Sequence, residues 1–326
     1  MKKGFTLVEL LAVIVILAVI LIIAIPQVLK VVDNSRINAY IKNEQMVLKA
    51  VDVYVSRNTG ELPGEQGDTT EISVNHLITN GFLTEITNPY NKNEYCTGYV
   101  TITKLSDTEY NYIPHLKCGL DINTSSEDGL IAHYPLENNA YDYSINNNHG
   151  DIYGNVICTE DGKKGKACSF NDFPAHIDLP IGSEITLDSD YTFSMWVKPN
   201  VITGNPIFFA SHNGSNQRVY ISIYGSKWDI GIQGSPWNTS LSNTFANTNW
   251  NHIVLVFCNG EAELYVNNEF SMKKNYTTYS LSSNFRLGLH RIHSSTYQFR
   301  GLIDEIKIYN RALSEQEIKF LYESTK

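Results

Sequence analysis

The chain has 326 residues, a hydrophobic content of 42% and a formal net charge of −9 at pH 7. This length suggests about two domains, and the composition is sufficient for packed cores. Lysine and arginine form only short pairs, such as Lys163–Lys164 and Lys273–Lys274, and a chain that repels phosphate overall is not expected to bind nucleic acid.

The first predicted element is an apolar segment over 5–25. Every residue of 10–25 is apolar, and at about 1.5 Å per residue the segment would form a helix about 31 Å long, which is one hydrocarbon thickness. Lys2 and Lys3 precede it, so the positive-inside rule places the N-terminus in the cytoplasm. No small-residue cleavage site follows near Pro26, as a secretory signal would require. We therefore expect a single membrane-spanning helix.

The opening residues, MKKGFTLVE, resemble the leader of type IV pilins and pseudopilins. The resemblance implies that 1–4 is a leader, that a prepilin peptidase cuts after Gly4, and that the new amine of Phe5 is methylated. It also implies a subunit held in the cytoplasmic membrane and later packed with other pilin subunits in an extracellular filament.

Glu9 lies about one helical turn beyond the amine that this cleavage would create. A carboxylate inside a membrane helix is costly when alone, but it can neutralise a buried ammonium group, most usefully that of a neighbouring subunit. We expect Glu9 to set the register of subunits during filament assembly. The alternative is a plain signal anchor in which Glu9 lies near the membrane interface.

The helix is expected to continue past Pro26 as part of a pilin-like domain over 5–120. An apolar stripe with spacings of three, four and seven indicates an amphipathic helix that ends near Arg57, before Gly60. The stripe consists of Ile37, Tyr40, Ile41, Val47, Leu48, Val51, Tyr54 and Val55. The turn-rich stretch GELPGEQGDTT follows, and ISVNHLITNGFL then predicts a short helix closed by Gly81.

A β-hairpin is predicted next, with strands over 99–105 and 109–116. If Asp107 is its centre, residues whose numbers sum to 214 face each other, and Cys96 and Cys118 form such a pair. Directly opposed residues have Cα atoms about 4.5–5.5 Å apart, which suits a disulfide. We therefore expect a Cys96–Cys118 bridge, which the resemblance to pilins also implies for this region.

A polar linker, DINTSSED, is predicted at 121–128. The residues of 129–326 then form many short strand-like runs between Gly, Asn and Ser turns. Several stretches, above all FRGLIDEIKIYNRALSEQEIKFLY (299–322), resemble the laminin-G-like, concanavalin A-type jelly roll. The predicted fold class is an α+β pilin domain, with a long helix and a small antiparallel sheet, followed by an all-β jelly-roll sandwich.

The last strand of this region predicts one buried carboxylate. Leu302, Ile306 and Ile308 alternate on one face, and Asp304 shares their parity. A buried carboxylate needs a cation or several hydrogen-bond donors. The resemblance suggests a structural calcium ion held by Asp304 and Asp142, which lies in an Asn-rich turn. The alternative is that Asp304 accepts bonds from N–H groups and hydroxyls while Asp142 closes an Asx-turn.

A closing helix is predicted after this strand by the capping box Ser314-x-x-Glu317, with Leu313 and Ile318 as its hydrophobic staple.

Two tryptophans are candidate sugar-stacking residues. Trp237 lies in an expected loop beside Asn238. Trp228 alternates with Ile230, so its burial in the core is the alternative to a role in ligand binding.

The remaining cysteines suit an exported protein. The five cysteines form no Cys-x-x-Cys pair, and the nine histidines share no zinc-type spacing with them. Cys158 and Cys168 flank a short loop and could form a second disulfide, which would leave Cys258 free.

No catalytic signature is evident, because the Glu-x-Asp-x-x-Glu strand of related glucanases is missing and no Ser-His-Asp context, P-loop or Rossmann fingerprint occurs. The sequence therefore predicts a non-catalytic minor pilin that displays a lectin-like adhesive module for a glycan or another surface ligand. Two alternatives stay open. The module could mediate protein–protein contacts without binding sugar, or the chain could be a pseudopilin of a secretion or DNA-uptake system.

Overall fold

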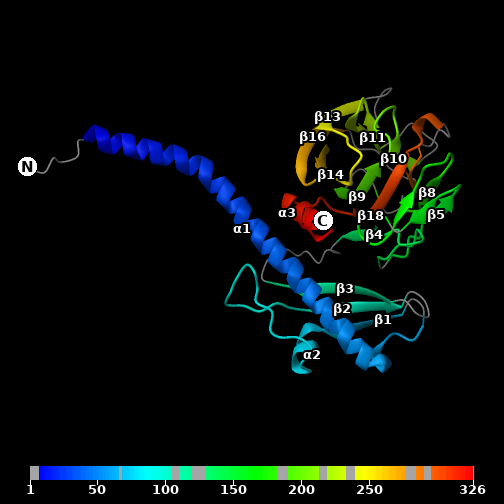
Figure 1. Ribbon diagram of the computed structural model, residues 1–326, viewed down its shortest axis with the longest axis horizontal. Coiled ribbons are helices and arrows are strands. Elements are labelled where there is room, and N and C mark those ends of the chain that lie inside the picture. Colours follow the sequence, from blue (N-terminus) through cyan, green and yellow to red (C-terminus); the bar gives the residue numbers. More distant parts are fainter. Residues whose placement is uncertain are drawn as a thin grey trace, which may run out of the picture. The chain divides into compact units, whose positions relative to one another are not determined.

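The computed structural model describes residues 7–65, 68–104, 110–118, 129–144, 146–159, 161–181, 185, 190–212, 219–232, 239–276, 284–289 and 295–325. The chain divides into two compact units, Met1–Ser125 and Ser126–Lys326 (Figure 1). The predicted linker at 121–128 lies outside the described residues.

The first unit is built on helix α1, which runs from Leu7 to Arg57 and contains Pro26. The predicted apolar stripe packs in the core, where Val47, Val51 and Tyr54 are buried. The side-chain amide of Asn58 donates to the carbonyl of Tyr54 (2.9 Å) just beyond the end of the helix.

Most side chains of the predicted membrane segment 5–25 lie outside the described set. Among the residues that are described, no helix combines the length and the apolar character needed to cross a membrane.

A small antiparallel sheet packs against α1. Its strands lie in the order β1 (Thr69–Ser73), β2 (Thr97–Lys104) and β3 (Tyr110–Lys117), with the short helices η1 (Thr59–Glu61) and α2 (Val74–Thr79) before and after β1. The β2–β3 register runs from Thr97 opposite Lys117 to Lys104 opposite Tyr110, so that each pair sums to 214, as predicted. The Cys96–Cys118 disulfide is present, with Cα atoms 4.3 Å apart. The predicted turn around Asp107 lies outside the described residues.

Strand β1 differs from the sequence prediction, which placed a turn and the start of a helix here. Ile72 pairs with Val100 and enters the core, so the helix begins only at Val74. Ser73 fixes this boundary because its Oγ accepts a hydrogen bond from the backbone N–H of His76 (3.1 Å), as an N-cap does.

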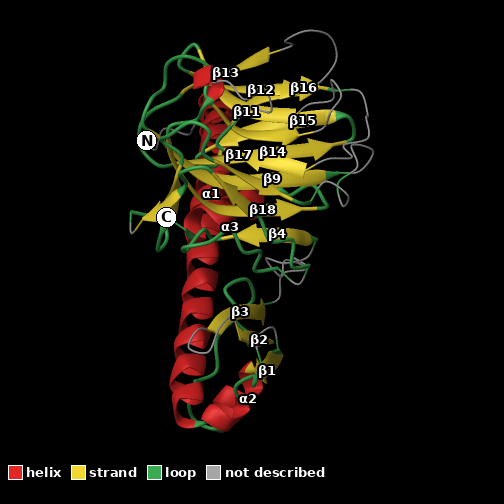
Figure 2. Cartoon of the chain, turned by 90° about the vertical axis from the view of Figure 1, so that its right-hand side faces the viewer, coloured by secondary structure: helices red, strands yellow, loops and turns green. Residues whose placement is uncertain are grey.

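The second unit is a sandwich of two antiparallel sheets (Figure 2). Within the described residues, the seven-stranded sheet has the order β13 (Thr239–Phe245), β12 (Lys227–Ile232), β11 (Val219–Tyr224), β10 (Ile207–His212), β17 (Asn284–Leu287), β8 (His176–Leu179) and β5 (Asp151–Tyr153). The eight-stranded sheet has the order β16 (Glu269–Asn275), β15 (Glu261–Val266), β14 (Asn251–Cys258), β9 (Tyr191–Pro199), β18 (Gly301–Tyr309), β7 (Ala167–Ser169) and β6 (Ile157–Thr159), and its eighth strand, β4 (Leu130–Tyr134), pairs with β18.

The core between these sheets is rich in aromatic rings. Phe193 of β9 contacts both Phe209 and Phe285 of the facing sheet, with ring centroids 4.6 and 5.0 Å apart. Every buried member of this core lies within 131–308. Because the first unit contributes nothing to it, we expect the second unit to fold by itself.

Strand β18 changes partner halfway along one of its edges, pairing first with β7 and then with β4, while β9 follows its other edge. At this point the register with β9 shifts between Asp304 and Lys307, and Glu305 has a φ of 48°. Such a shift is a β-bulge, in which one strand carries an extra residue.

The bulge reverses the side-chain alternation predicted for this strand. Ile303 faces the core before the bulge, and Ile306 and Ile308 face it afterwards. The prediction that Leu302 shares the inner face is therefore wrong, because a strict period of two does not hold across an inserted residue. Asp304 is fully buried nonetheless, on the outer side of the sheet.

The chain closes with η2 (Ser295–Tyr297), β18 and the helix α3 (Glu315–Ser324). The predicted capping box is formed, since Ser314 and Glu317 bond each other's backbone N–H groups. Leu313 and Ile318 pack together in a small second core between α3 and the outer face of the eight-stranded sheet.

Candidate functional site

The predicted assembly motif is described only in part. Gly4 and Phe5 lie outside the described residues, and Glu9 belongs to α1 but its side chain is outside them as well. The roles expected for these residues stay predictions.

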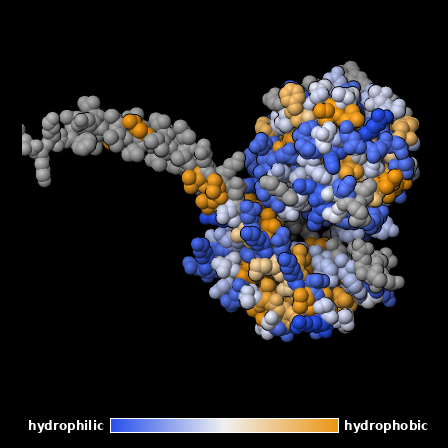
Figure 3. Space-filling view, in the orientation of Figure 1, coloured by the Kyte–Doolittle hydropathy of each residue, from blue (hydrophilic) through white to orange (hydrophobic). Residues whose placement is uncertain are grey.

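The described side chains in the N-terminal half of α1 are apolar and exposed. Five of them are each more than half exposed: Leu11, Ile14, Ile16, Val28 and Val31. Figure 3 shows hydrophobic side chains on the described part of this helix. Several exposed apolar side chains on one helix are typical of a surface that lipid or another protein covers.

Asp142 is held in the Asn-rich turn by four hydrogen-bond donors. Its Oδ1 accepts from the N–H groups of His133 (2.9 Å) and Ser144 (2.8 Å), and its Oδ2 accepts from the Ser144 hydroxyl (2.8 Å) and the N–H of Asn148 (2.8 Å). The alternative expected from the sequence, an Asx-turn, describes these contacts.

Asp304 is also surrounded by donors. Its Oδ2 accepts from the backbone N–H groups of Lys163 (2.7 Å) and Lys164 (3.0 Å), and its Oδ1 accepts from the N–H of Glu305 (2.8 Å). The carboxylate therefore anchors the loop before β7 to the bulge of β18.

These two carboxylates do not fit the predicted calcium site. Calcium is bound by six to eight oxygen atoms, whereas N–H and hydroxyl groups converge on both Asp142 and Asp304. Among the described residues, no group of three or more His, Cys, Asp and Glu side chains has a metal-binding arrangement.

The pKa values of the two acidic residues in the bulge are shifted in opposite directions. The pKa of Asp304 is raised to about 7, because burial disfavours its charge more than the backbone N–H groups favour it. Burial also opposes the charge of Glu305, but the neighbouring His133, Lys164 and Lys307 outweigh it and lower the pKa of that carboxyl to about 2.

One of the two tryptophan candidates lies within the described residues. Trp228 is fully buried on the inner face of β12, where its ring packs against Phe208 with centroids 5.8 Å apart. Because no part of it reaches solvent, it cannot stack on a sugar, and the ligand prediction for Trp228 is wrong. Trp237 lies outside the described residues.

The second expected disulfide is also present and joins β6 to β7. Cys158 and Cys168 lie opposite each other, with Cα atoms 3.9 Å apart. Of the described cysteines, Cys258 is the free one.

The structure brings together an aromatic platform that the sequence did not reveal. Tyr153 of β5 lies opposite His176 of β8, with ring centroids 4.9 Å apart and planes 12° from parallel. The Nδ1 atom of His176 lies 2.6 Å from the carbonyl of Pro174, which fixes the imidazole. Tyr153 is 47% exposed, and Phe173, in the loop before β8, is exposed to the same extent.

Charged and polar side chains continue this platform across the outer face of the seven-stranded sheet. Asp178 lies opposite Asp151 on one side and opposite Arg286 on the other. Arg286 donates from Nε to Oδ1 (2.6 Å) and from Nη2 to Oδ2 (2.9 Å) of Asp178, forming a bidentate ion pair. Asp172 accepts a bond from the side-chain amide of Asn155 (2.7 Å) at the edge.

We refer to Tyr153, Phe173, His176, Asp178 and Arg286 as the platform. The exposed ring of Tyr153 lies two residues from Asp151 on β5, and Asp151 lies opposite Asp178, so a hydroxyl-rich ligand could use a ring and a carboxylate together. No local signal in the sequence identifies it, because its residues come from three strands and one loop.

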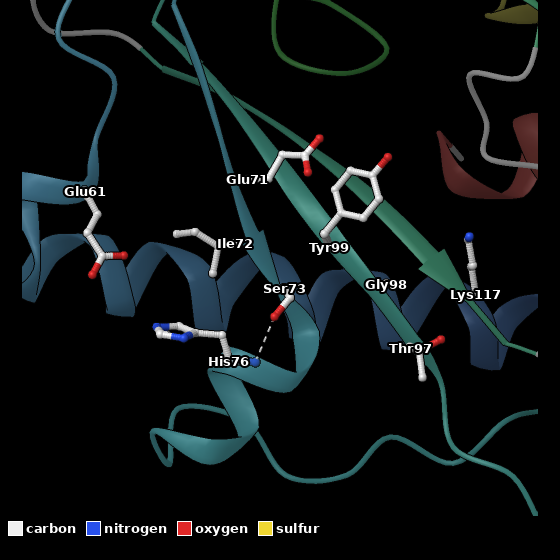
Figure 4. A pocket seen from close by; sticks show the side chains of 9 residues that line it. All are labelled: Glu61, Glu71, Ile72, Ser73, His76, Thr97, Gly98, Tyr99 and Lys117. Atoms are coloured by element: carbon white, nitrogen blue, oxygen red, sulfur yellow. Dashed lines mark hydrogen bonds between the residues drawn. The ribbon is translucent and has the colours of Figure 1, made fainter.

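The first unit carries a separate open pocket of about 540 Å³ (Figure 4). Its lining combines both signs of charge with hydroxyl groups and two aromatic rings: Glu61, Glu71, Ile72, Ser73, His76, Thr97, Gly98, Tyr99 and Lys117. In Figure 4 the Glu61 and Lys117 side chains lie at opposite ends of the pocket, so the charged groups do not converge on a common point.

Two family matches fall on the two units. Residues 1–25 match the prokaryotic N-terminal methylation motif, and residues 174–319 match the concanavalin A-like lectin/glucanases superfamily. No curated protein matches the chain.

Solved structures that are similar to this chain include a toxin domain and an arabinanase domain. The binding domain of botulinum neurotoxin serotype D/C VPI 5993 is 13% identical, with a TM-score of 0.51, over 62% of this chain and 53% of that one. Domain 4 of AbnA, a GH43 extracellular arabinanase from Geobacillus stearothermophilus, in complex with arabinotriose, is 25% identical, with a TM-score of 0.47, over 61% of this chain and 100% of that one. The toxin domain shows that the two chains share a fold.

Proposed function

We propose that this chain, which joins a pilin-type N-terminal methylation motif to a concanavalin A-like domain, is a minor pilin that displays a non-catalytic glycan-binding module outside the cell. The observation that carries the proposal is the presence of both features in one chain, each on its own compact unit.

The exposed apolar side chains of α1 support the assembly part of the proposal. Side chains such as Ile14, Ile16 and Val31 are surrounded by lipid before assembly and by the helices of other subunits afterwards, since leaving them in water costs about 25 cal/mol per Å². Glu9 then pairs with the methylated amine of Phe5 on a neighbouring subunit. Because the two buried charges are tolerable only when paired, this pairing selects the correct axial offset between subunits.

The size of the second unit supports a minor role. It spans about 200 residues, from Ser126 to Lys326, and a globular module of this size at every position would crowd a helical array. We therefore place the protein at the filament tip or at sparse positions along it.

The platform supports a sugar ligand for the second unit. An exposed aromatic ring such as Tyr153 packs against the apolar face of a pyranose, while carboxylate and amide groups bond its hydroxyls. Asp151 lies two residues before Tyr153 on β5 and opposite Asp178, and Arg286 is paired with only one of these two carboxylates. Neutral glycans should therefore bind better than sialylated or uronic ones, because like charges repel.

Catalysis is not part of this proposal. At the platform, the acidic residue nearest the arginine is held in a bidentate ion pair, and that arrangement suits ligand contact rather than a general acid.

A glycan array probed with residues 126–326 tests the ligand. Binding to neutral glycans is expected, whereas an array without any binder would favour a module that makes only protein contacts.

Mass spectrometry of the mature surface protein tests the processing, since its first residue should be a methylated Phe5. A Glu9→Gln variant should be cleaved normally but should enter filaments poorly.

A further inference from the structure

Gln298, which follows η2, lies at the centre of an unusual group of backbone carbonyls. Its residue is 4% exposed. Its Nε2 atom lies 2.9 Å from the carbonyl oxygen of Gly288, 3.0 Å from those of Ala175 and Phe299, and 3.1 Å from that of Phe170. We call these four carbonyl oxygens the cage.

The cage contains more acceptors than an amide can fully satisfy. An NH₂ group has two hydrogens, so the four carbonyls share them in three-centre bonds. The Oε1 atom of Gln298 is buried and has no hydrogen-bond partner among the described residues. A neutral side chain thus presents its positive end to the negative ends of four carbonyl dipoles. Its own buried acceptor stays unsatisfied, which costs free energy of folding.

Several carbonyl oxygens that converge on one point form the type of surrounding that proteins build for a cation. Here the distances of 2.9–3.1 Å suit a nitrogen donor and exceed the 2.3–2.6 Å typical of calcium. The cage is therefore built around the amide and not around a calcium ion.

The cage also fixes the loop on which the platform rests. Phe170 and Ala175 contribute carbonyls from the two ends of the loop that carries Phe173. Ala175 immediately precedes His176, which supports the Tyr153 ring. Gly288 follows β17, the strand of Arg286, and its positive φ of 83° brings its backbone against the ring of Phe170.

We propose that the amide of Gln298 takes the place of a structural cation in the second unit, so that the platform loop is held without calcium. The part of the inference that concerns ligand binding rests on the proposed function, but the part that concerns stability does not.

Thermal unfolding of residues 126–326 tests the proposal, with EDTA or with millimolar CaCl₂. The wild-type midpoint should be the same in both. Gln298→Met removes the donors and keeps the side-chain length, so its midpoint should fall by about 5 °C or more in both conditions. Gln298→Glu places a carboxylate against four carbonyls. Its midpoint should fall further in EDTA and recover partly with calcium, which would then have carboxylate and carbonyl ligands.

Gln316→Glu is the matched control, because it makes the same change of charge at an exposed position of α3. Its midpoint should respond to calcium no more than that of wild type. A wild-type midpoint that falls in EDTA would overturn the proposal, and so would a Gln298→Glu variant that responds to calcium no more than Gln298→Met.

The ligand arm uses a glycan identified on the array. Wild-type affinity should be equal in EDTA and in calcium, and Gln298→Met should bind at least about threefold more weakly at a temperature where it remains folded. If no glycan binds, the proposed function fails while the unfolding experiment still decides the role of Gln298.

Discussion

Tyr153 stacks on His176 across β5 and β8, and the imidazole behind it is fixed by the Pro174 carbonyl. Removing the ring by Tyr153→Ala should weaken glycan binding about tenfold, because an aromatic stacking contact contributes about 1–1.5 kcal/mol. Isothermal titration with the best array ligand measures the change.

Tyr141→Ala is the control for this variant. Tyr141 is also about half exposed and also lies beside a histidine, His149, with ring centroids 4.8 Å apart. It should bind as wild type does. Equal losses in the two variants would show that the platform is not the specific site.

Gly231 permits the close approach of Tyr220 from the neighbouring strand. The two residues lie opposite each other, and a Cβ atom at Gly231 would clash with the tyrosine ring. Gly231→Ala should therefore destabilise the second unit by about 1–3 kcal/mol in urea unfolding. The double variant with Tyr220→Ala should be more stable than the sum of the single effects predicts, and simple additivity would contradict the clash.

The Cys96–Cys118 bridge closes a loop with a sequence separation of 22 residues. Replacing both cysteines by serine should lower the stability of the first unit by about 3 kcal/mol, since the unfolded chain gains freedom. Calorimetry should show a shift in the transition of the first unit only, because the two cores share no residues. Cys258→Ser, at a free cysteine, should leave both transitions unchanged.

The elements that the sequence predicted well are those determined by local chemistry. The β2–β3 register pairs residues whose numbers sum to 214, so this register and the Cys96–Cys118 pair could be predicted from residue numbers alone. The capping box at Ser314 likewise needs only residues three apart. Such interactions depend little on the rest of the fold.

The elements that the sequence did not predict depend on distant partners. The bulge at Glu305 arises where β18 exchanges one neighbouring strand for another, and no local pattern encodes that change. Asp178 and Arg286 are 108 positions apart and meet only because β8 pairs with β17. The platform and the Gln298 cage therefore become visible only in the folded sandwich.

The buried carboxyl of Asp304 should make the stability of the second unit depend on pH. Its pKa is about 7 in the folded state and about 3.9 in an unfolded chain, so the folded state binds the extra proton between these values. The free energy of unfolding that Asp304 contributes is therefore fully present below about pH 4 and is lost as the pH rises through about 7. Asp304→Asn, which stays neutral, should lack this dependence.

The measurement is urea unfolding of wild type and Asp304→Asn at several pH values between about 4 and about 7.5. The difference between the free energies of unfolding of the two proteins is needed because the titration of His252 changes stability with pH in the opposite direction. Burial lowers the pKa of His252 to about 3, so its contribution to stability is lost as the pH falls below about 6.5. Both proteins contain His252, and its effect cancels in the difference.

The difference between the two free energies of unfolding should change by a few kcal/mol over this pH range, since each unit of pKa shift corresponds to about 1.4 kcal/mol. A constant difference over this range would mean that the Asp304 carboxyl stays charged in the fold and that the three N–H groups around it outweigh its burial.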